Sequence, residues 1–260
     1  MLKKILLKSM VVGSLLSVSL LNANQLEDIK KSGVLKVAVP QDFAPFGSVS
    51  KDMSIEGYDV DTAKLIADKL GVKLELIPVT SANRIPYLQT GKANLTISSL
   101  GKNPQRAKAI DFSDAYGIFY LGVFGSKDVN VTAVSDLKGK TVGVTRGTIE
   151  DMELSDKVDS SVTIRRFEDN NMTTSSFLSG QVNLIATGNV IVSELARKNP
   201  GKEEAVTKFM LKNNPCYIGV KKGEPELLAY VNSFIKEYKV NGKLNESSKK
   251  WFRMDLPKDL

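Results

Sequence analysis

The stretch A-N-L-T-I-S-S-L-G-K-N-P-Q-R-A-K-A-I-D-F-S-D-A-Y, residues 93–116, decides how the rest of the chain is interpreted. Residues 95–97 are apolar and predict a short strand that ends in a polar turn. Asn103 and Pro104 then predict a helix start, because Asn caps helices well and Pro suits the first helical position. Arg106 stands in that first turn, where a cation opposes the helix dipole. An anion bound between Arg106 and the free amides of the turn explains its presence.

Two other interpretations of Arg106 remain open on the residues alone. The side chain can lie on the surface, or it can pair with Asp111 or Asp114 later in the same stretch. Both account for the cation without any ligand.

The same stretch resembles the ligand loop of the periplasmic polar amino-acid-binding proteins, the solute receptors of ABC importers (bacterial solute-binding protein family 3). Their pattern is a strand, a Ser/Thr-rich turn, T-x-x-R and [V/I]-D-F-S-x-x-Y, which stands here as S-S-L-G-K-N-P-Q-R-A-K-A-I-D-F-S-D-A-Y. In that family the Arg binds the α-carboxylate of the ligand. The match implies this role for Arg106 and places Ser99 and Gly101 in the ligand loop.

Three further motifs in the first half of the chain are similar to the same family. They are P-Q-D-F-A-P-F at 40–46, G-Y-D-V-D at 57–61 and N-R-I-P-Y-L-Q-T-G-K at 83–92. The resemblance implies that Phe43 forms an aromatic wall against the ligand. It also implies that Arg84 reaches a carboxylate on the ligand's side chain, as in members that bind acidic amino acids. A purely structural Arg84 is the open alternative.

Asp59 and Asp61 lie at the start of a predicted apolar helix that ends at Gly71. Acidic side chains suit that place, because they cap the first turn and pair with the helix dipole. We therefore interpret both carboxylates as structural rather than as a catalytic pair.

The second half of the chain carries the motif R-G-T-I-E-D at 146–151, whose amide-rich helix start can meet an anion. The resemblance implies that Thr148 and the Ile149 amide grip the ligand. Relatives pair the α-ammonium group of the ligand with an Asp, but that position is Gly188 here. Gly101 likewise replaces a Ser or Thr hydroxyl. Asn189, the neighbouring Thr187 or backbone carbonyls are the substitutes that the sequence offers, and they are weaker acceptors than a carboxylate.

The first 23 residues resemble a secretory signal peptide. Three lysines precede an apolar run at 10–21, and a small residue, Ala23, follows as a suitable cleavage point. The run is shorter than the roughly 20 residues that a membrane span needs. We expect a periplasmic or secreted protein processed near Ala23. The single cysteine, Cys216, excludes an internal disulfide, and we expect it to be buried and unreactive.

The composition excludes several functional classes. The formal charge is +7, but the lysines are dispersed, which indicates a solvated surface rather than a nucleic-acid footprint. The chain has no histidine, and this removes His triads, His metal sites and His general bases. No dinucleotide, P-loop or CxxC motif is present, so we expect no cofactor and no metal.

Strand–helix units with short loops predict an α/β fold with mainly parallel sheets. The resemblance extends over nearly the whole mature chain and implies the two-lobed periplasmic-binding-protein fold (type II), with two crossing strands. We expect a signal peptide at 1–23, a discontinuous lobe 1 at 24–121 and 216–260, and lobe 2 at 122–215.

The resemblance implies an extracytoplasmic substrate-binding component of an ABC importer. It would work as a monomer, capture a small carboxylate-bearing solute by hinge closure, and deliver it to a membrane permease. We expect an amino acid, with acidic or polar ones favoured, and no enzyme activity. Two alternatives stay open: a prephenate-type (cyclohexadienyl) dehydratase on the same scaffold, with Glu150 or Glu168 as the acid, and a ligand-sensing domain for a separate receptor.

Overall fold

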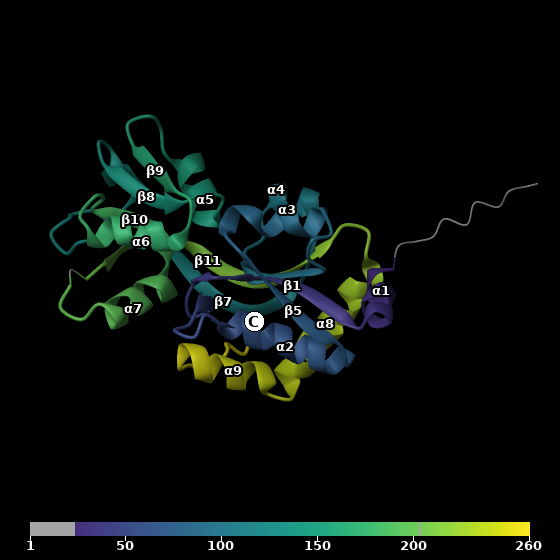
Figure 1. Ribbon diagram of the computed structural model, residues 1–260. Helices are drawn as coiled ribbons and strands as arrows, with labels where there is room; N and C mark the ends of the chain where they lie inside the picture. Colours follow the sequence, from purple (N-terminus) through teal and green to yellow (C-terminus); the bar gives the residue numbers. More distant parts are fainter. Residues whose placement is uncertain (1–23, 203) are drawn as a thin grey trace, which may run out of the picture.

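The computed structural model describes residues 24–202 and 204–260, which form two α/β lobes (Figure 1). Lobe 1 contains α1 (Gln25–Ser32), β1 (Val34–Pro40), β2 (Asp42–Phe43), β3 (Gly47–Val49), β4 (Ile55–Glu56), α2 (Tyr58–Leu70), β5 (Lys73–Val79), η1 (Ser81–Asn83), α3 (Arg84–Gln89), β6 (Leu95–Leu100), α4 (Pro104–Ala109), α8 (Pro225–Val240) and α9 (Lys243–Phe252). Lobe 2 contains η2 (Val134–Leu137), β8 (Thr141–Thr145), α5 (Ile149–Lys157), β9 (Thr163–Phe167), α6 (Asn170–Leu178), β10 (Leu184–Gly188) and α7 (Asn189–Lys198). Two long strands, β7 (Ile110–Gly125) and β11 (Val206–Lys221), run through both lobes.

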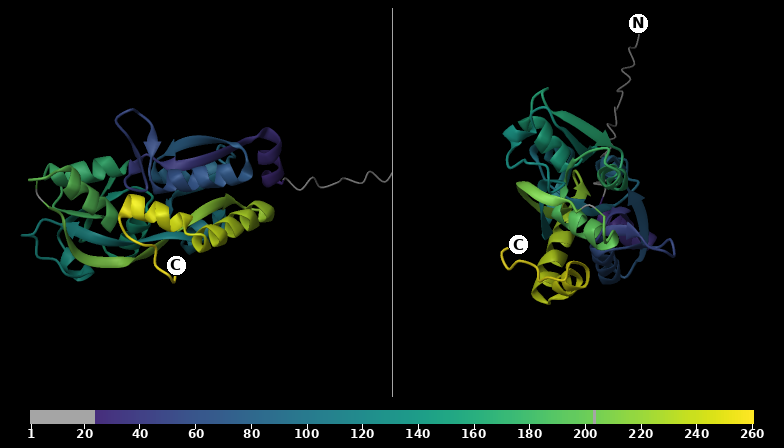
Figure 2. Two further views of the ribbon diagram at one scale, coloured as in Figure 1. Left: turned by 90° about the horizontal axis from the view of Figure 1, so that it is seen from below. Right: turned by 90° about the vertical axis from the view of Figure 1, so that its left-hand side faces the viewer.

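One eight-stranded sheet joins the lobes, in the order β5-β1-β6-β11-β7-β10-β8-β9. In lobe 1, β1 pairs in parallel with β5 and β6, and in lobe 2, β8 pairs in parallel with β9 and β10. The left view of Figure 2 shows an elongated molecule with lobe 2 at one end and α1 at the other. The carboxyl ends of parallel strands are where open α/β sheets bind ligands. In this fold the ends of β6 and β8 lead to the loops around Gly101 and Thr148.

The connection between the lobes is the antiparallel pair β7 and β11. Its register runs from Val206 opposite Gly125 to Lys221 opposite Ile110, with several irregularities on the way. Each strand has 16 residues, so its two halves lie in different lobes. Two adjacent strands allow the lobes to rotate while keeping them in register, which is the geometry of a hinge.

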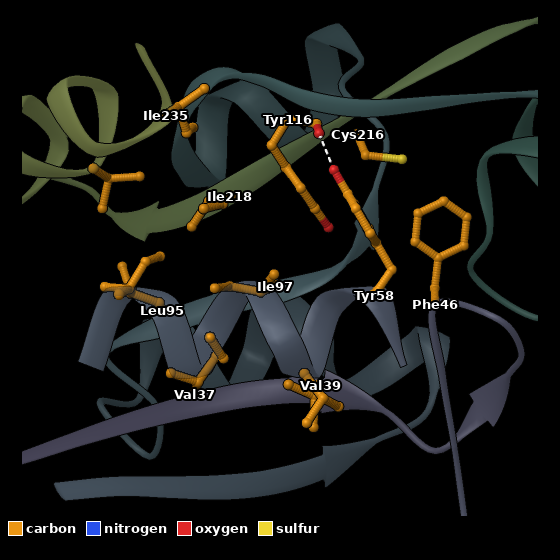
Figure 3. Close-up of a cluster of buried hydrophobic side chains, with 14 of the residues drawn as sticks. Val37, Val39, Phe46, Tyr58, Leu95, Ile97, Tyr116, Cys216, Ile218 and Ile235 are labelled. Atoms are coloured by element: carbon orange, nitrogen blue, oxygen red, sulfur yellow. Dashed lines mark hydrogen bonds between the residues drawn. The ribbon is translucent and has the colours of Figure 1, made fainter. Parts of the chain in front are cut away.

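The largest apolar core lies in lobe 1, where α2 packs on β1, β6 and the crossing strands (Figure 3). Tyr58 and Tyr116 stack within it, with ring centroids 5.7 Å apart, and the Tyr58 hydroxyl donates a hydrogen bond to the Tyr116 carbonyl. Figure 3 shows Phe46 and Cys216 beside this pair. The core therefore anchors β7 just before it crosses to lobe 2.

Most of the elements expected from the sequence are present. The strand expected at 95–97 lies in β6, and the apolar helix expected to end at Gly71 is α2. Asn103 caps α4 by accepting a hydrogen bond from the Arg106 amide. One bound differs: β6 continues to Leu100, beyond the end at Ile97 that the apolar pattern predicts. The type of each element follows from local pattern, whereas its bounds depend on partners in the sheet.

Cys216 is buried, as expected, and burial raises the pKa of its thiol well above the usual range. The leader at 1–23 lies outside the described residues, so its cleavage stays a prediction. Among the helices of the described residues, none is long and apolar enough to cross a membrane.

Candidate functional site

A small cavity lies between the two lobes. Lobe 1 contributes Phe43, Arg84, Ser99 and Gly101, lobe 2 contributes Thr148, Ile149 and Glu150, and the crossing strands contribute Phe119 and Asn214. Six of the nine residues proposed from the sequence therefore meet at one place. The other three, Arg106, Gly188 and Asn189, do not line it. The lobes are closed on each other around this cavity.

Arg84 is the cation that lines the cavity. It begins α3, is 6 % exposed, and one guanidinium nitrogen donates to the Ser81 hydroxyl. Its Nε is buried and has no hydrogen-bond partner among the described residues. Burial lowers the pKa of Arg84, and the carboxylates of Asp42, Glu150 and Asp59 oppose that shift. Arg84 is thus a buried cation with donor capacity left for a ligand.

Arg106 lies behind Gly101 and is also buried. Its Nη1 donates to the Gly101 carbonyl at 2.7 Å, and its Nη2 donates to the Gly147 carbonyl of lobe 2 at 2.8 Å. Its Nε has no partner among the described residues. Burial and the nearby Arg84 cation lower the pKa of Arg106 to about 9, so it stays charged at neutral pH.

The structure excludes both alternatives to a buried Arg106 that the sequence left open. The side chain is 4 % exposed, so it does not lie on the surface. Asp111 pairs instead with Lys222, and Asp114 interacts through its amide with Asn232. Among the described residues, the guanidinium of Arg106 therefore has only carbonyl partners within hydrogen-bond distance, and its role toward a carboxylate stays a prediction.

Glu150 is the carboxylate that lines the cavity, in the first turn of α5, and it is 4 % exposed. Burial raises its pKa to about 7, against the lowering effects of its own amide, Arg84, the Thr148 hydroxyl and Arg106. The sequence analysis considered Glu150 only as an acid for the rival dehydratase. The sequence contained a signal for this position: Glu150 directly follows Gly147-Thr148-Ile149, so its side chain belongs to the same helix start as the two residues proposed to bind the ligand.

Ser99 owes its position to a buried carboxylate far away in the chain. Asp59 accepts a hydrogen bond from the Ser99 amide at 2.7 Å and another from the Tyr116 hydroxyl. Ser99 has a φ of 45°, a left-handed conformation that is uncommon outside glycine. The contact holds this turn in place beside the cavity. Asp59 is structural, as expected, but it fixes the ligand loop rather than capping α2.

Two glycines at the site leave no room for the side chains that relatives carry. A Cβ on Gly188 would lie 2.7 Å from the Phe119 ring and 3.2 Å from Phe43. A Cβ on Gly101 would lie 2.2 Å from the Asn214 Oδ1 and 2.8 Å from Ile149. Phe119 and Asn214, which the sequence analysis missed, therefore occupy the space that these glycines leave.

Asn189 lies away from the cavity. Its Oδ1 accepts a hydrogen bond from the Tyr120 amide at 3.0 Å, and its side chain lines a second, larger hollow beside α7. That hollow, about 2710 Å³ and open to solvent, also extends along Trp251 and the segment after α9. Phe119 lines both spaces, whereas Arg84 and Glu150 line only the small cavity.

A polar contact joins the lobes beside the cavity. The Asp42 carboxylate of lobe 1 accepts hydrogen bonds from the Asn170 amide at 2.7 Å and from its Nδ2 at 3.1 Å, at the start of α6 in lobe 2. The Thr145 hydroxyl donates to the Asn170 Oδ1, which fixes the orientation of this side-chain amide. Burial raises the pKa of Asp42, and the Asn170 donors and Arg84 oppose the shift.

No group of three or more Cys, Asp or Glu side chains suited to a metal ion is present in 24–202 and 204–260. The site combines two buried cations, one lining carboxylate, aromatic walls and the amide-rich start of α5. Such a set recognises charge and shape, because its charged groups lie on both sides of a cleft that excludes water.

Comparisons with known proteins agree with the two-lobed fold. The model of the family described as bacterial extracellular solute-binding proteins, family 3, matches residues 35–254. The ABC transporter glutamine-binding protein GlnH of Bacillus subtilis is 31% identical over 232 residues, which are 87% of this chain and 84% of that protein.

Two solved structures are also similar. The solute receptor for L-cysteine of Neisseria gonorrhoeae has a TM-score of 0.80 at 31% identity, over 87% of this chain and 92% of that chain. The ancestral amino acid-binding protein AncCDT-1, a precursor of cyclohexadienyl dehydratase, has a TM-score of 0.80 at 31% identity, over 88% of this chain and 100% of that chain.

Proposed function

Because the chain belongs to the bacterial extracellular solute-binding proteins, family 3, we propose that it is the substrate-binding component of an ABC importer. Its solute is a small carboxylate-bearing molecule, an amino acid, with acidic or polar ones favoured. The supporting observation is that Arg84 and Arg106 are both buried at the cleft between the lobes without a carboxylate within 4 Å among the described residues. Buried cations of this kind are expensive unless an anion joins them.

The mechanism is closure of one lobe on the other. Lobe 1 holds the carboxylate through its arginines, with Ser99 and Phe43 beside them. Lobe 2 adds Thr148 and the Ile149 amide only when the cleft closes. Ligand therefore shifts an open–closed equilibrium by the contacts that it makes in the closed form alone. The membrane permease then distinguishes the closed form from the open one.

The preference for acidic or polar side chains follows from the charges in the cleft. Arg84 is the lining cation and Glu150 the lining carboxylate, and the buried Arg106 is bonded to the carbonyl of Gly101, which also lines the cavity. A cationic side chain closed into this cavity would lose its hydration and meet like charge.

Native mass spectrometry of the purified protein before dialysis, followed by calorimetry, tests the proposal. The calorimetric panel is lysine, arginine, aspartate, glutamate, glutamine and cysteine. We expect binding of one or more of the last four. Tight binding of lysine or arginine alone would contradict the preference, and no binding of any amino acid would contradict the function.

A dehydratase on the same scaffold is the second candidate. One observation favours it: the pKa of Glu150 is raised to about 7 inside the cavity, as suits a general acid. Glu168, the other candidate acid, is exposed and pairs with Arg146. Incubation with prephenate and arogenate tests this candidate, and formation of an aromatic product would establish it over a purely binding role.

The proposed location is the periplasm or the extracellular space, with the protein acting as a monomer. The leader motif and the family both support export. N-terminal sequencing of exported material should begin at or next to Asn24. A full-length leader retained in the membrane fraction would contradict this.

A further inference from the structure

The ammonium group of an amino acid needs an acceptor that the usual positions of this chain do not offer. Gly188 has no side chain to accept a hydrogen bond, and a Cβ there would lie 2.7 Å from the Phe119 ring. Asn189, the sequence-adjacent substitute, accepts a hydrogen bond from the Tyr120 amide and lines a different hollow. The acceptor must therefore come from another part of the cleft.

Three buried carboxylates surround Arg84: Asp42, Asp59 and Glu150. Two of them already have donors from distant segments. Asp42 accepts both nitrogens of Asn170, and Asp59 accepts the Ser99 amide and the Tyr116 hydroxyl. Both carboxylates therefore already accept hydrogen bonds within the protein and are poor candidates for binding the ligand's ammonium group.

Glu150 differs from the other two. It lines the cavity, and in the described residues no lysine or arginine nitrogen lies within 4 Å of its carboxylate. Its nearby groups are its own amide and the Thr148 hydroxyl, and the single proton of that hydroxyl is donated to the Thr145 carbonyl at 2.9 Å. Arg84 and Glu150 thus share one small cavity without pairing with each other. A zwitterionic ligand carries the two opposite charges that match them, a carboxylate for Arg84 and an ammonium group for Glu150.

We propose that Glu150 accepts the ammonium group of a zwitterionic amino acid whose carboxylate is held by the buried arginines of lobe 1. The proposal rests on the proposed function and specifies its ligand class. Glu150 belongs to lobe 2 and the arginines belong to lobe 1, so the two charges of the ligand connect the two lobes. A solute with the carboxylate alone leaves Glu150 buried and unmatched, and closure around it is disfavoured.

The test compares four pairs of solutes that differ only in this group: aspartate and malate, glutamate and 2-hydroxyglutarate, and glutamine and cysteine each with its 2-hydroxy analogue. Calorimetry is performed on the wild type, Glu150→Gln and Glu150→Asp. The matched control is Glu153→Gln, since Glu153 lies one turn further along α5 and pairs with Lys157 and Lys212 outside the cavity. Circular dichroism and thermal melting confirm that each variant is folded.

We expect the wild type to bind an amino acid of the panel and to bind its hydroxy analogue at least about 100-fold more weakly. Glu150→Gln should weaken amino-acid binding by about 30-fold to several thousand-fold, the usual effect of removing one partner of a buried charge pair. It should leave hydroxy-acid binding within threefold or improve it. Glu150→Asp should retain part of the discrimination, and Glu153→Gln all of it.

Two results would overturn the inference and leave the proposed function intact. One is amino-acid affinity within threefold of wild type in Glu150→Gln. The other is equal wild-type affinity for an amino acid and its hydroxy analogue. A wild type that binds no solute of either kind would overturn the proposed function, and the inference with it.

Discussion

The contact between Asp42 and Asn170 predicts a latch that acts only when the cleft is closed. Asp42 belongs to β2 of lobe 1 and Asn170 begins α6 of lobe 2, so opening the lobes separates them. In the open form water hydrates both groups. In the closed form the carboxylate receives the Asn170 amide and its Nδ2, and it also lies at the positive end of the α6 dipole.

Replacing Asp42 by Ala removes the acceptor from the closed form alone. The buried Asn170 amide is then left without a partner, which costs about 1–3 kcal/mol. The open form gains no such penalty, so ligand affinity should fall by about 5- to 150-fold. The melting temperature of the ligand-free protein should change little, because Asp42 contributes to closure rather than to the core of either lobe.

Asp169→Ala is the matched control, because Asp169 caps the same helix from within lobe 2 by accepting from the Met172 amide at 2.7 Å. Loss of this cap should lower the stability of the protein by about 0.5–2 kcal/mol in both forms and keep the affinity within about twofold. Calorimetry measures affinity with the amino acid that binds the wild type, and thermal melting measures stability. Equal loss of affinity in both variants, or unchanged affinity in Asp42→Ala, would refute the latch.

Three other substitutions test the site. Arg106→Met removes the guanidinium donors, so calorimetry should show ligand binding weakened by about 3–5 kcal/mol, while the melting temperature of the ligand-free protein changes little. Unchanged affinity with a large fall in that melting temperature would make Arg106 a structural residue. Gly101→Ala would place its Cβ 2.2 Å from the Asn214 Oδ1 and 2.8 Å from Ile149 of lobe 2. Small-angle scattering with ligand should therefore show a cleft that stays more open than in the wild type, and an equally compact complex would contradict this. Burial raises the pKa of Asp59 in the folded protein from 3.8 to about 7. The native state therefore binds this proton more tightly than the unfolded chain does, and the free energy of unfolding falls as the pH rises from about 4 to about 7. Asp59→Asn should remove about 2–3 kcal/mol of that fall when urea unfolding at pH 5 and at pH 7.5 is compared. An equal change in stability between the two pH values in the wild type and the variant would contradict the raised pKa of Asp59.

Local chemistry allowed the sequence to determine the elements and much of the site. Asn103 and Pro104 start α4 because capping and the fixed φ of proline act within one turn. The six residues that line the cavity as proposed belong to motifs at the carboxyl ends of strands, where the fold class puts a ligand. These features depend on residues that are close together in the sequence, so they can be predicted from the sequence motifs.

Tertiary structure alone decided which charged groups meet. Asp59 reaches the Ser99 amide 40 residues later, Asp42 reaches Asn170 across 128 residues, and the Phe119 ring fills the space beside Gly188. Glu150 has its place in the cavity because α5 and α3 lie in different lobes that close on each other. Interactions between charged groups are strong only in the low dielectric of the protein interior. That environment forms only when the two lobes pack together and exclude water.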